Sequence, residues 1–172
     1  MSLHRAAPRS RWLSCPAYPG GMLEARKVTL WRDRYDLVAD GKAVASWDGW
    51  FWRSGGTFYL AGRRYDVKSN VWGNRFEMID EVGVIVAAAN GVRRKRWTVE
   101  AGGWTYQFQR ASPWRSEELI LADGRPAGSV RRVGGSGRSG VVADLPGLPL
   151  LLQIFVVVVV VIRWDAQDGA AG

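Results

Sequence analysis

The stretch that most constrains this chain is residues 148–162, LPLLLQIFVVVVVVI, which carries no charged side chain. A segment that is apolar on every side must be buried on every side, in protein or in lipid. The 14 residues from Pro149 to Ile162 would form a helix of about 21 Å, whereas a bilayer core needs about 20 residues. The length therefore favours a helix buried in protein over 148–162. A tail anchor in a membrane and a central strand are the two alternatives.

After Gly21 the sequence changes to short runs in which apolar, aromatic and β-branched residues alternate with polar ones, a pattern typical of strands. Pairs such as Asp40-Gly41 and Asn90-Gly91 separate these runs and predict tight hairpin turns. Gly55-Gly56 is interpreted as a further turn. Thirteen such runs account for about twelve predicted strands: 28–31, 35–39, 43–47, 50–53, 57–60, 64–68, 75–80, 84–88, 94–100, 104–109, 117–122, 127–132 and 141–144.

The strand count and the apolar run together predict an all-β fold with one buried helix. A barrel of more than about eight strands leaves a lumen that something must fill, and a closed barrel with a central helix has no free strand edges. A six-residue strand is about 20 Å long, close to the length of the apolar helix. We expect a roughly twelve-stranded closed antiparallel barrel over residues 22–165. Residues 1–21 are expected to be a disordered basic tail, and 166–172 a short flexible one.

The charge of the chain and its content of cysteine and histidine limit the partners and catalytic sites that it could have. The chain has 24 Lys and Arg against 16 Asp and Glu, a net charge of +8, which suits an anionic membrane surface, nucleic acid or an acidic protein partner. Cys15 is the only cysteine and His4 the only histidine, so a disulfide framework, a zinc site or a Ser/His/Asp triad cannot be assembled. We predict a cytoplasmic protein that is not an enzyme and uses no metal or cofactor.

Several short segments resemble one known superfamily. They are RFEMID at 75–80, RKRWTV at 94–99, GSVRR at 128–132 and the Asp144-Leu145-Pro146 lead into the apolar run. With the order of hairpins followed by a hydrophobic helix, these segments resemble the tubby-like C-terminal fold of tubby proteins, phospholipid scramblases and LURP-one-related proteins. The likeness covers roughly residues 23–164 and is greatest to bacterial LURP-one-related proteins.

The resemblance implies a central helix in a closed barrel and a basic site for phosphoinositide headgroups on the barrel wall. Scramblase-type proteins also carry an acidic calcium-binding stretch before the helix and clusters of palmitoylated cysteines. This chain has only Asp144 at the first position and only Cys15 for the second, so neither property is carried over.

Three basic clusters are candidates for a phospholipid-headgroup site: Arg93-Arg94-Lys95, Arg63-Arg64 and Arg131-Arg132. Cations at a strand end bind phosphate groups of lipid or of nucleic acid, but they also form solvated rims that keep sheet edges apart. We predict a non-enzymatic binding module, peripheral at the membrane, that takes anionic phospholipid headgroups. A protein-interaction module and a nucleic-acid-binding module are the alternatives.

The acidic pairs Asp80-Glu81 and Glu117-Glu118 invite a comparison with paired catalytic carboxylates. Adjacent residues on a strand point to opposite faces, so both pairs are interpreted as turn or surface charge. The sequence GSGRSG at 135–140 matches GxGxxG but lacks the βαβ context of a dinucleotide site, and a flexible connection is expected.

Four tryptophans could form a stacking platform for bases or sugars. Packing against the central helix is the preferred interpretation for them. They are Trp47, Trp50, Trp52 and Trp72.

Overall fold

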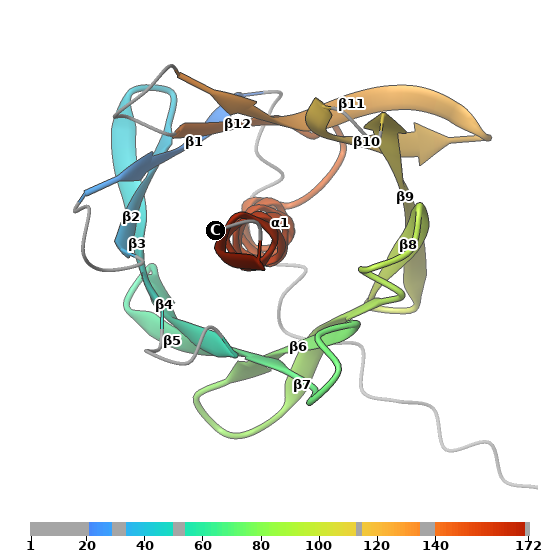
Figure 1. Ribbon diagram of the computed structural model, residues 1–172. Coiled ribbons are helices and arrows are strands. Elements are labelled where there is room, and N and C mark those ends of the chain that lie inside the picture. Colours follow the sequence, from blue (N-terminus) through green and yellow to red (C-terminus); the bar gives the residue numbers. More distant parts are fainter. Residues whose placement is uncertain (1–20, 29–33, 50–53, 113–114, 135–139, 171–172) are drawn as a thin grey trace, which may run out of the picture.

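The computed structural model describes residues 21–28, 34–49, 54–112, 115–134 and 140–170. In these residues, twelve antiparallel strands close into a barrel around one C-terminal helix, as predicted (Figure 1). Each strand pairs with the next in the chain, and β12 pairs with β1 to close the ring. The strands are β1 (Leu23–Lys27), β2 (Arg34–Ala39), β3 (Lys42–Gly49), β4 (Gly55–Leu60), β5 (Arg63–Ser69), β6 (Arg75–Asp80), β7 (Ile85–Asn90), β8 (Arg96–Ala101), β9 (Trp104–Ser112), β10 (Arg115–Ala122), β11 (Arg125–Val133) and β12 (Gly140–Asp144).

Alternation along each strand sets which side chains face the helix. On β8, Trp97 and Val99 are buried while Thr98 between them is half-exposed. Phe108 of β9 lies opposite Trp97, and the two rings stack with centroids 4.4 Å apart. Stacked aromatic pairs of this kind contribute about 0.5–1.5 kcal/mol beyond the area that they bury. The inner face of the barrel wall is mainly apolar and packs against the helix.

The helix α1 (Leu150–Ala170) runs along the barrel axis (Figure 1). Its first turn forms on Pro149, whose carbonyl oxygen accepts hydrogen bonds from the backbone N–H groups of Leu152 and Gln153. Every residue from 151 to 164 is buried. By length and composition α1 is apolar enough to cross a membrane, but 78% of its most apolar window is enclosed by the barrel. The all-round apolar surface thus has a protein environment here.

The helix is longer than the predicted 148–162. It begins two residues later, because Leu148 and Pro149 lead into its first turn, and it continues to Ala170. Arg163 and Trp164 remain buried because the barrel wall supplies partners for both. Residues 166–170, expected to be part of a short flexible tail, form the exposed last turns of this helix, and 171–172 lie outside the described residues.

Because successive strands alternate in direction, successive turns lie at opposite ends of the barrel. We call the end where α1 begins the N-end and the end where it finishes the C-end. Leu151 lines a pocket with residues of the β4–β5 and β6–β7 turns, which places those turns at the N-end. Arg163 donates a hydrogen bond to the carbonyl oxygen of Val92, which places the β7–β8 turn at the C-end.

The first strand of the described chain, β1, begins before the predicted run 28–31. Leu23 and Ala25 face the core, and Val28, the one described residue of that run, follows the strand as an exposed residue. Residues 29–31 lie outside the described residues, as does the predicted strand 50–53.

Gly55 and Gly56 do not form a turn, because both belong to β4 and are buried. A Cβ atom on Gly56 would lie 2.6 Å from Cζ2 of Trp47 and 2.3 Å from the carbonyl oxygen of Asp48. Gly56 therefore makes room for the buried indole ring on the neighbouring strand. In the sequence, such a glycine looks the same as one that marks a turn.

Candidate functional site: basic turns at two ends of the barrel

The three predicted basic clusters do not form one site. Arg63 and Arg64 follow the β4–β5 turn at the N-end, beside Leu151 of the helix. Arg93 and Lys95 belong to the β7–β8 turn at the C-end, next to the contact between Val92 and Arg163. Because the helix spans the barrel between them, a single headgroup cannot bind to both clusters. Each cluster has to be judged by its own surroundings.

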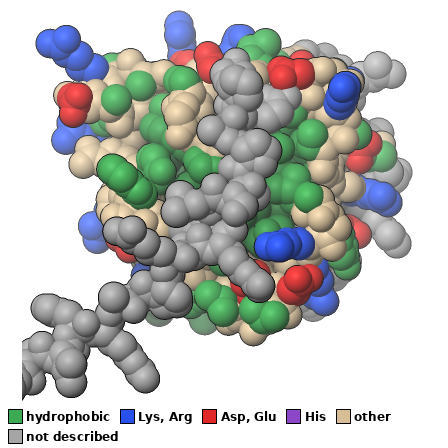
Figure 2. Space-filling view, turned by 180° about the vertical axis from the view of Figure 1, so that it is seen from behind, with side chains coloured by type: hydrophobic (Ala, Val, Ile, Leu, Met, Phe, Trp, Pro, Cys, Tyr) green, Lys and Arg blue, Asp and Glu red, His purple; other side chains and the backbone are tan. Residues whose placement is uncertain are grey.

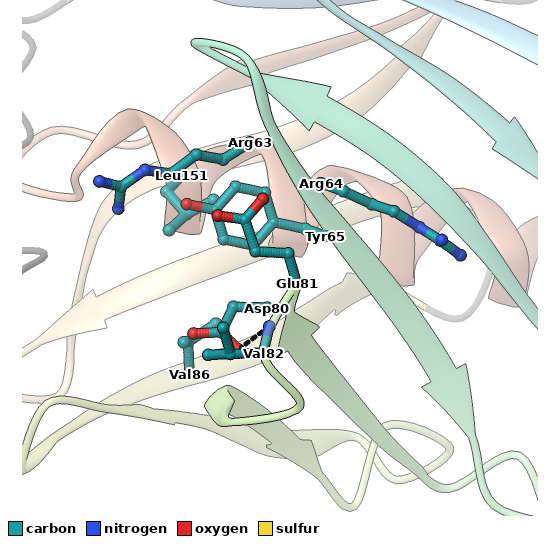
Figure 3. A pocket seen from close by; sticks show the side chains of 8 residues that line it. All are labelled: Arg63, Arg64, Tyr65, Asp80, Glu81, Val82, Val86 and Leu151. Atoms are coloured by element: carbon teal, nitrogen blue, oxygen red, sulfur yellow. Dashed lines mark hydrogen bonds between the residues drawn. The ribbon is translucent and has the colours of Figure 1, made fainter.

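The N-end cluster shares a shallow pocket of about 230 Å³ with two carboxylates, Asp80 and Glu81 (Figure 3). Figure 3 shows Arg63 and Arg64 pointing in opposite directions from β5, so they do not converge on one ligand. The side chain of Arg64 forms an ion pair with Asp66 at 3.1 Å. This mixture of signs is poorly suited to an anionic ligand.

The pair Arg131-Arg132 lies on β11. The guanidinium of Arg132 forms an ion pair with Asp168 at 2.8 Å and lies over the ring of Trp164, 5.2 Å from its centroid. These contacts fasten the end of α1 to the barrel wall, so Arg132 has a structural role. Arg131 is exposed on the outer face.

The β7–β8 turn carries Arg93, Arg94 and Lys95, all three exposed. Gly91 adopts a φ of +70° and its carbonyl oxygen accepts the N–H of Arg94 at 2.8 Å, which fixes the turn. In the described part of the chain, no carboxylate forms an ion pair with any of the three. This turn, which we call the cationic turn (residues 93–95), therefore has its positive charge available for a ligand.

A second loop lies against the cationic turn. The guanidinium of Arg93 donates a hydrogen bond of 3.2 Å to the carbonyl oxygen of Trp72, and the N–H of Val92 donates to the carbonyl oxygen of Asn74 at 3.1 Å. This β5–β6 loop presents Val71 at 96% exposure and Trp72 at 74%. Two large apolar side chains thus lie in solvent beside three cations.

The acidic pairs were interpreted as turn or surface charge. This is correct for Asp80-Glu81 but wrong for Glu118 of the second pair. Asp80 is a turn residue, because its Oδ1 accepts the N–H groups of Val82 (3.1 Å) and Val84 (2.8 Å). Glu117 lies half-exposed on strand β10, but its neighbour Glu118 is fully buried and is neither turn nor surface charge.

Glu118 binds three groups inside the wall. It accepts hydrogen bonds from a guanidinium nitrogen of Arg163, the one charged residue in the buried part of the helix (151–164), and from Nε1 of Trp97 at 2.9 Å. Nε of Arg110 lies 3.7 Å from its Oε1. A buried carboxylate persists only when it is paired and hydrogen-bonded, and these partners explain why the strand tolerates it. Sequence reasoning missed this pair, although a lone Arg directly after an apolar run was a visible signal.

The two described members of the tryptophan set, Trp47 and Trp72, do not share a surface. Trp47 is buried in the core, whereas Trp72 projects into solvent from the β5–β6 loop. Trp50 and Trp52 lie outside the described residues, as does nearly all of the GxGxxG sequence. Among the residues that the structure describes, no group of three or more His, Cys, Asp or Glu side chains has the arrangement of a metal site.

Comparison with known proteins gives little further guidance. No protein-family model matches the sequence, and no curated protein matches it. Among solved structures, an X-ray structure of a protein from Arabidopsis thaliana aligns with a TM-score of 0.38 and 14% identity, covering 84% of this chain and 92% of that one. A likeness of this degree establishes neither family nor function.

Proposed function

We propose that this protein is a non-enzymatic binding module for anionic phospholipid headgroups and that the cationic turn at the C-end is its binding site. The observation that carries the proposal is the set of three exposed cations, Arg93, Arg94 and Lys95, with no ion-pair partner in the described chain. The other two clusters have carboxylates among their neighbours.

We further propose that the chain belongs to the tubby-like superfamily and is most similar to LURP-one-related proteins. The closed twelve-stranded barrel around a hydrophobic C-terminal helix supports this placement. The superfamily's headgroup binding is consistent with a site on the barrel. Under this proposal the protein is cytoplasmic and peripheral at the membrane.

The surroundings of the cationic turn favour a lipid surface over nucleic acid. Duplex binders typically neutralise about 6–10 phosphates along an extended basic surface. Here a compact group of three cations lies beside the exposed side chains of Val71 and Trp72, and apolar side chains next to cations suit the boundary between headgroups and acyl chains. Each cation near an anionic bilayer contributes about 1 kcal/mol, so the three together account for roughly a hundredfold in the binding constant.

The test is co-sedimentation with vesicles of phosphatidylcholine alone, and of phosphatidylcholine mixed with phosphatidylserine or with a phosphatidylinositol bisphosphate. The wild-type protein should bind only the anionic vesicles. Replacing Arg93, Arg94 and Lys95 together by Ala should weaken that binding about a hundredfold. The melting temperature should not change, because all three side chains are exposed. Free inositol phosphates as competitors distinguish a headgroup site from general attraction to a charged surface.

The matched control removes the same charge from the N-end by replacing Lys42, Arg63 and Arg64 with Ala. It should bind anionic vesicles almost as tightly as the wild type. Loss of binding in this control with normal binding in the first variant would contradict the assignment to the C-end. A wild-type protein that binds a DNA duplex, or neither ligand, would rule out the lipid proposal in favour of the nucleic-acid or protein-interaction alternatives.

A further inference from the structure

The β5–β6 loop beside the cationic turn has an unusual composition for an exposed loop. Val71 and Trp72 are 96% and 74% exposed, the highest values for large hydrophobic side chains among the described residues of the C-end. Water contact with large apolar side chains is unfavourable by about 25 cal/mol per Å². An exposed apolar pair next to a charged binding surface is a common mark of an interaction site.

The loop is held in this exposed conformation by its own hydrogen bonds. Oδ1 of Asn70 accepts the N–H groups of Asn74 (3.1 Å) and Arg75 (3.2 Å), and Nδ2 of Asn70 donates to Oδ1 of Asn74 at 2.7 Å. The carbonyl oxygen of Asn70 also accepts the N–H of Gly73, which adopts a φ of +62°. The loop therefore presents Val71 and Trp72 without needing to reorganise when a partner binds, which lowers the entropy cost of binding.

Two contacts make this loop and the cationic turn one surface. They are the hydrogen bonds from Arg93 to the carbonyl oxygen of Trp72 and from the N–H of Val92 to the carbonyl oxygen of Asn74. The turn that carries the positive charge is thus joined to the backbone of the loop that carries the apolar side chains. Trp in particular is enriched where one side of a residue meets water and the other meets hydrocarbon.

The two ends of the barrel differ in the charges that lie next to their exposed apolar side chains. The N-end also exposes apolar side chains, with Val82 at 77% and Trp104 at 69%. Figure 2 shows the face of the barrel opposite to the view of Figure 1, with hydrophobic side chains toward its middle and charges of both signs mostly near its margin. There, however, Glu81 adjoins Val82 and Glu100 lines a groove with Trp104. Carboxylates beside the apolar residues oppose contact with an anionic bilayer. At the C-end, Val71 and Trp72 instead adjoin the cationic turn, and the carboxylate of Asp168 at that end is paired with Arg132. This difference in charge favours the C-end as the membrane-facing surface.

We infer that Val71 and Trp72 insert into the headgroup and upper acyl region of an anionic bilayer while Arg93, Arg94 and Lys95 bind its headgroups. This inference rests on the proposed function and adds the depth and orientation of binding: the C-end faces the membrane and the N-end faces the cytoplasm. The insertion contributes an apolar component to binding that salt does not screen, in addition to the electrostatic component that salt weakens.

The first experiment measures binding of Trp72→Ala to phosphatidylcholine–phosphatidylserine vesicles across a salt series. Removing the indole should weaken binding on the order of tenfold, in proportion to the apolar area it buries, and by the same factor at every salt concentration. The cation-to-alanine variant should instead lose most at low salt. Trp104→Ala at the N-end is the matched control and should bind as the wild type does.

The second experiment reports depth directly. Cys15 is the only cysteine, so in a Cys15→Ser background a single cysteine can be introduced at Val71, or at Val82 as the control, and labelled with an environment-sensitive fluorophore. On anionic vesicles, the label at position 71 should shift to the blue and be quenched by lipids that carry a nitroxide on the upper acyl chain. The label at position 82 should show neither change.

The two proposals fail in different ways. If the cation variant loses vesicle binding while Trp72→Ala binds normally and the label at 71 does not shift, the headgroup site stands and the insertion is refuted. If the label at position 82 shifts instead, the orientation is wrong. If the wild-type protein binds no anionic vesicle, the proposed function fails and the insertion fails with it.

Discussion

The buried pair of Glu118 and Arg163 makes a quantitative prediction about how the helix is held in the barrel. Both side chains are almost entirely excluded from solvent, and they join strand β10 to the last buried turn of α1. Replacing Glu118 by Gln keeps the shape of the side chain and an acceptor for Trp97 but removes the negative charge. Arg163 is then left as a buried cation without its carboxylate partner.

Breaking a buried ion pair by removing one partner typically costs 3–5 kcal/mol, and a small domain has a total stability of about 5–15 kcal/mol. We therefore expect Glu118→Gln to lower the free energy of unfolding by about 4 kcal/mol. For a chain of this size, each kcal/mol shifts the melting temperature by about 2–4 °C, which gives a fall of roughly 8–16 °C. The adjacent Glu117→Gln is the matched control, and its half-exposed position on the same strand predicts a change within about 0.5 kcal/mol.

Urea denaturation followed by tryptophan fluorescence measures these changes by linear extrapolation. Arg163→Met should cost less than Glu118→Gln, because Nε of Arg110 lies 3.7 Å from Glu118 and partly compensates for the lost cation. The double variant should be more stable than Glu118→Gln alone, because both charges are then gone. Additive losses in the double variant, or equal stability of Glu118→Gln and Glu117→Gln, would refute the view that a desolvated ion pair holds the helix in place.

Two further predictions concern the barrel interior. Val158 is 2% exposed in the middle of α1, so Val158→Asp buries an unpaired carboxylate at a cost of several kcal/mol and should prevent recovery of soluble folded protein. The control, Val71→Asp in the exposed loop, should express and melt normally. A Val158→Asp protein with a normal melting curve would contradict the central burial of the helix. Burial raises the pKa of Tyr106 above its ordinary value of 10.0. The unfolded chain therefore loses this proton at a lower pH than the folded chain, and the free energy of unfolding falls as the pH rises above about 10. In urea titrations, Tyr106→Phe should lose less stability than the wild type over this pH range, and an identical loss would show that Tyr106 does not contribute to the pH dependence.

The sequence alone was enough to predict the fold because its two patterns leave few solutions. An apolar run with no polar face must be surrounded, and about twelve alternating strands form a barrel wide enough to surround it. Local details were less predictable. Gly55 and Gly56 look like a turn because glycine signals turns, yet Gly56 serves the packing of Trp47 across the sheet, and contacts between strands are not visible in a single strand's sequence.

The same reason explains why Glu118 was misinterpreted. Apolar residues occupy both faces around it, since Leu119 and Ile120 follow directly, so alternation could not show which face points inward. Only the closed sheet brings Glu118 to Arg163, 45 positions along the chain, and to Trp97 of another strand.

The basic clusters could be found from the sequence, but their positions and partners in the barrel could not. Their charge was visible in the sequence, but the end of the barrel that each turn occupies depends on the number of strands before it. Direct pairing of β3 with β4 sets the direction of every later strand and hence the end of the barrel at which each later turn lies. Charge is a property of the residues themselves and can be read from the sequence. Whether a cation meets a carboxylate, as Arg64 and Arg132 do, or lies beside an exposed Trp72, as Arg93 does, is decided by how distant strands close into a ring.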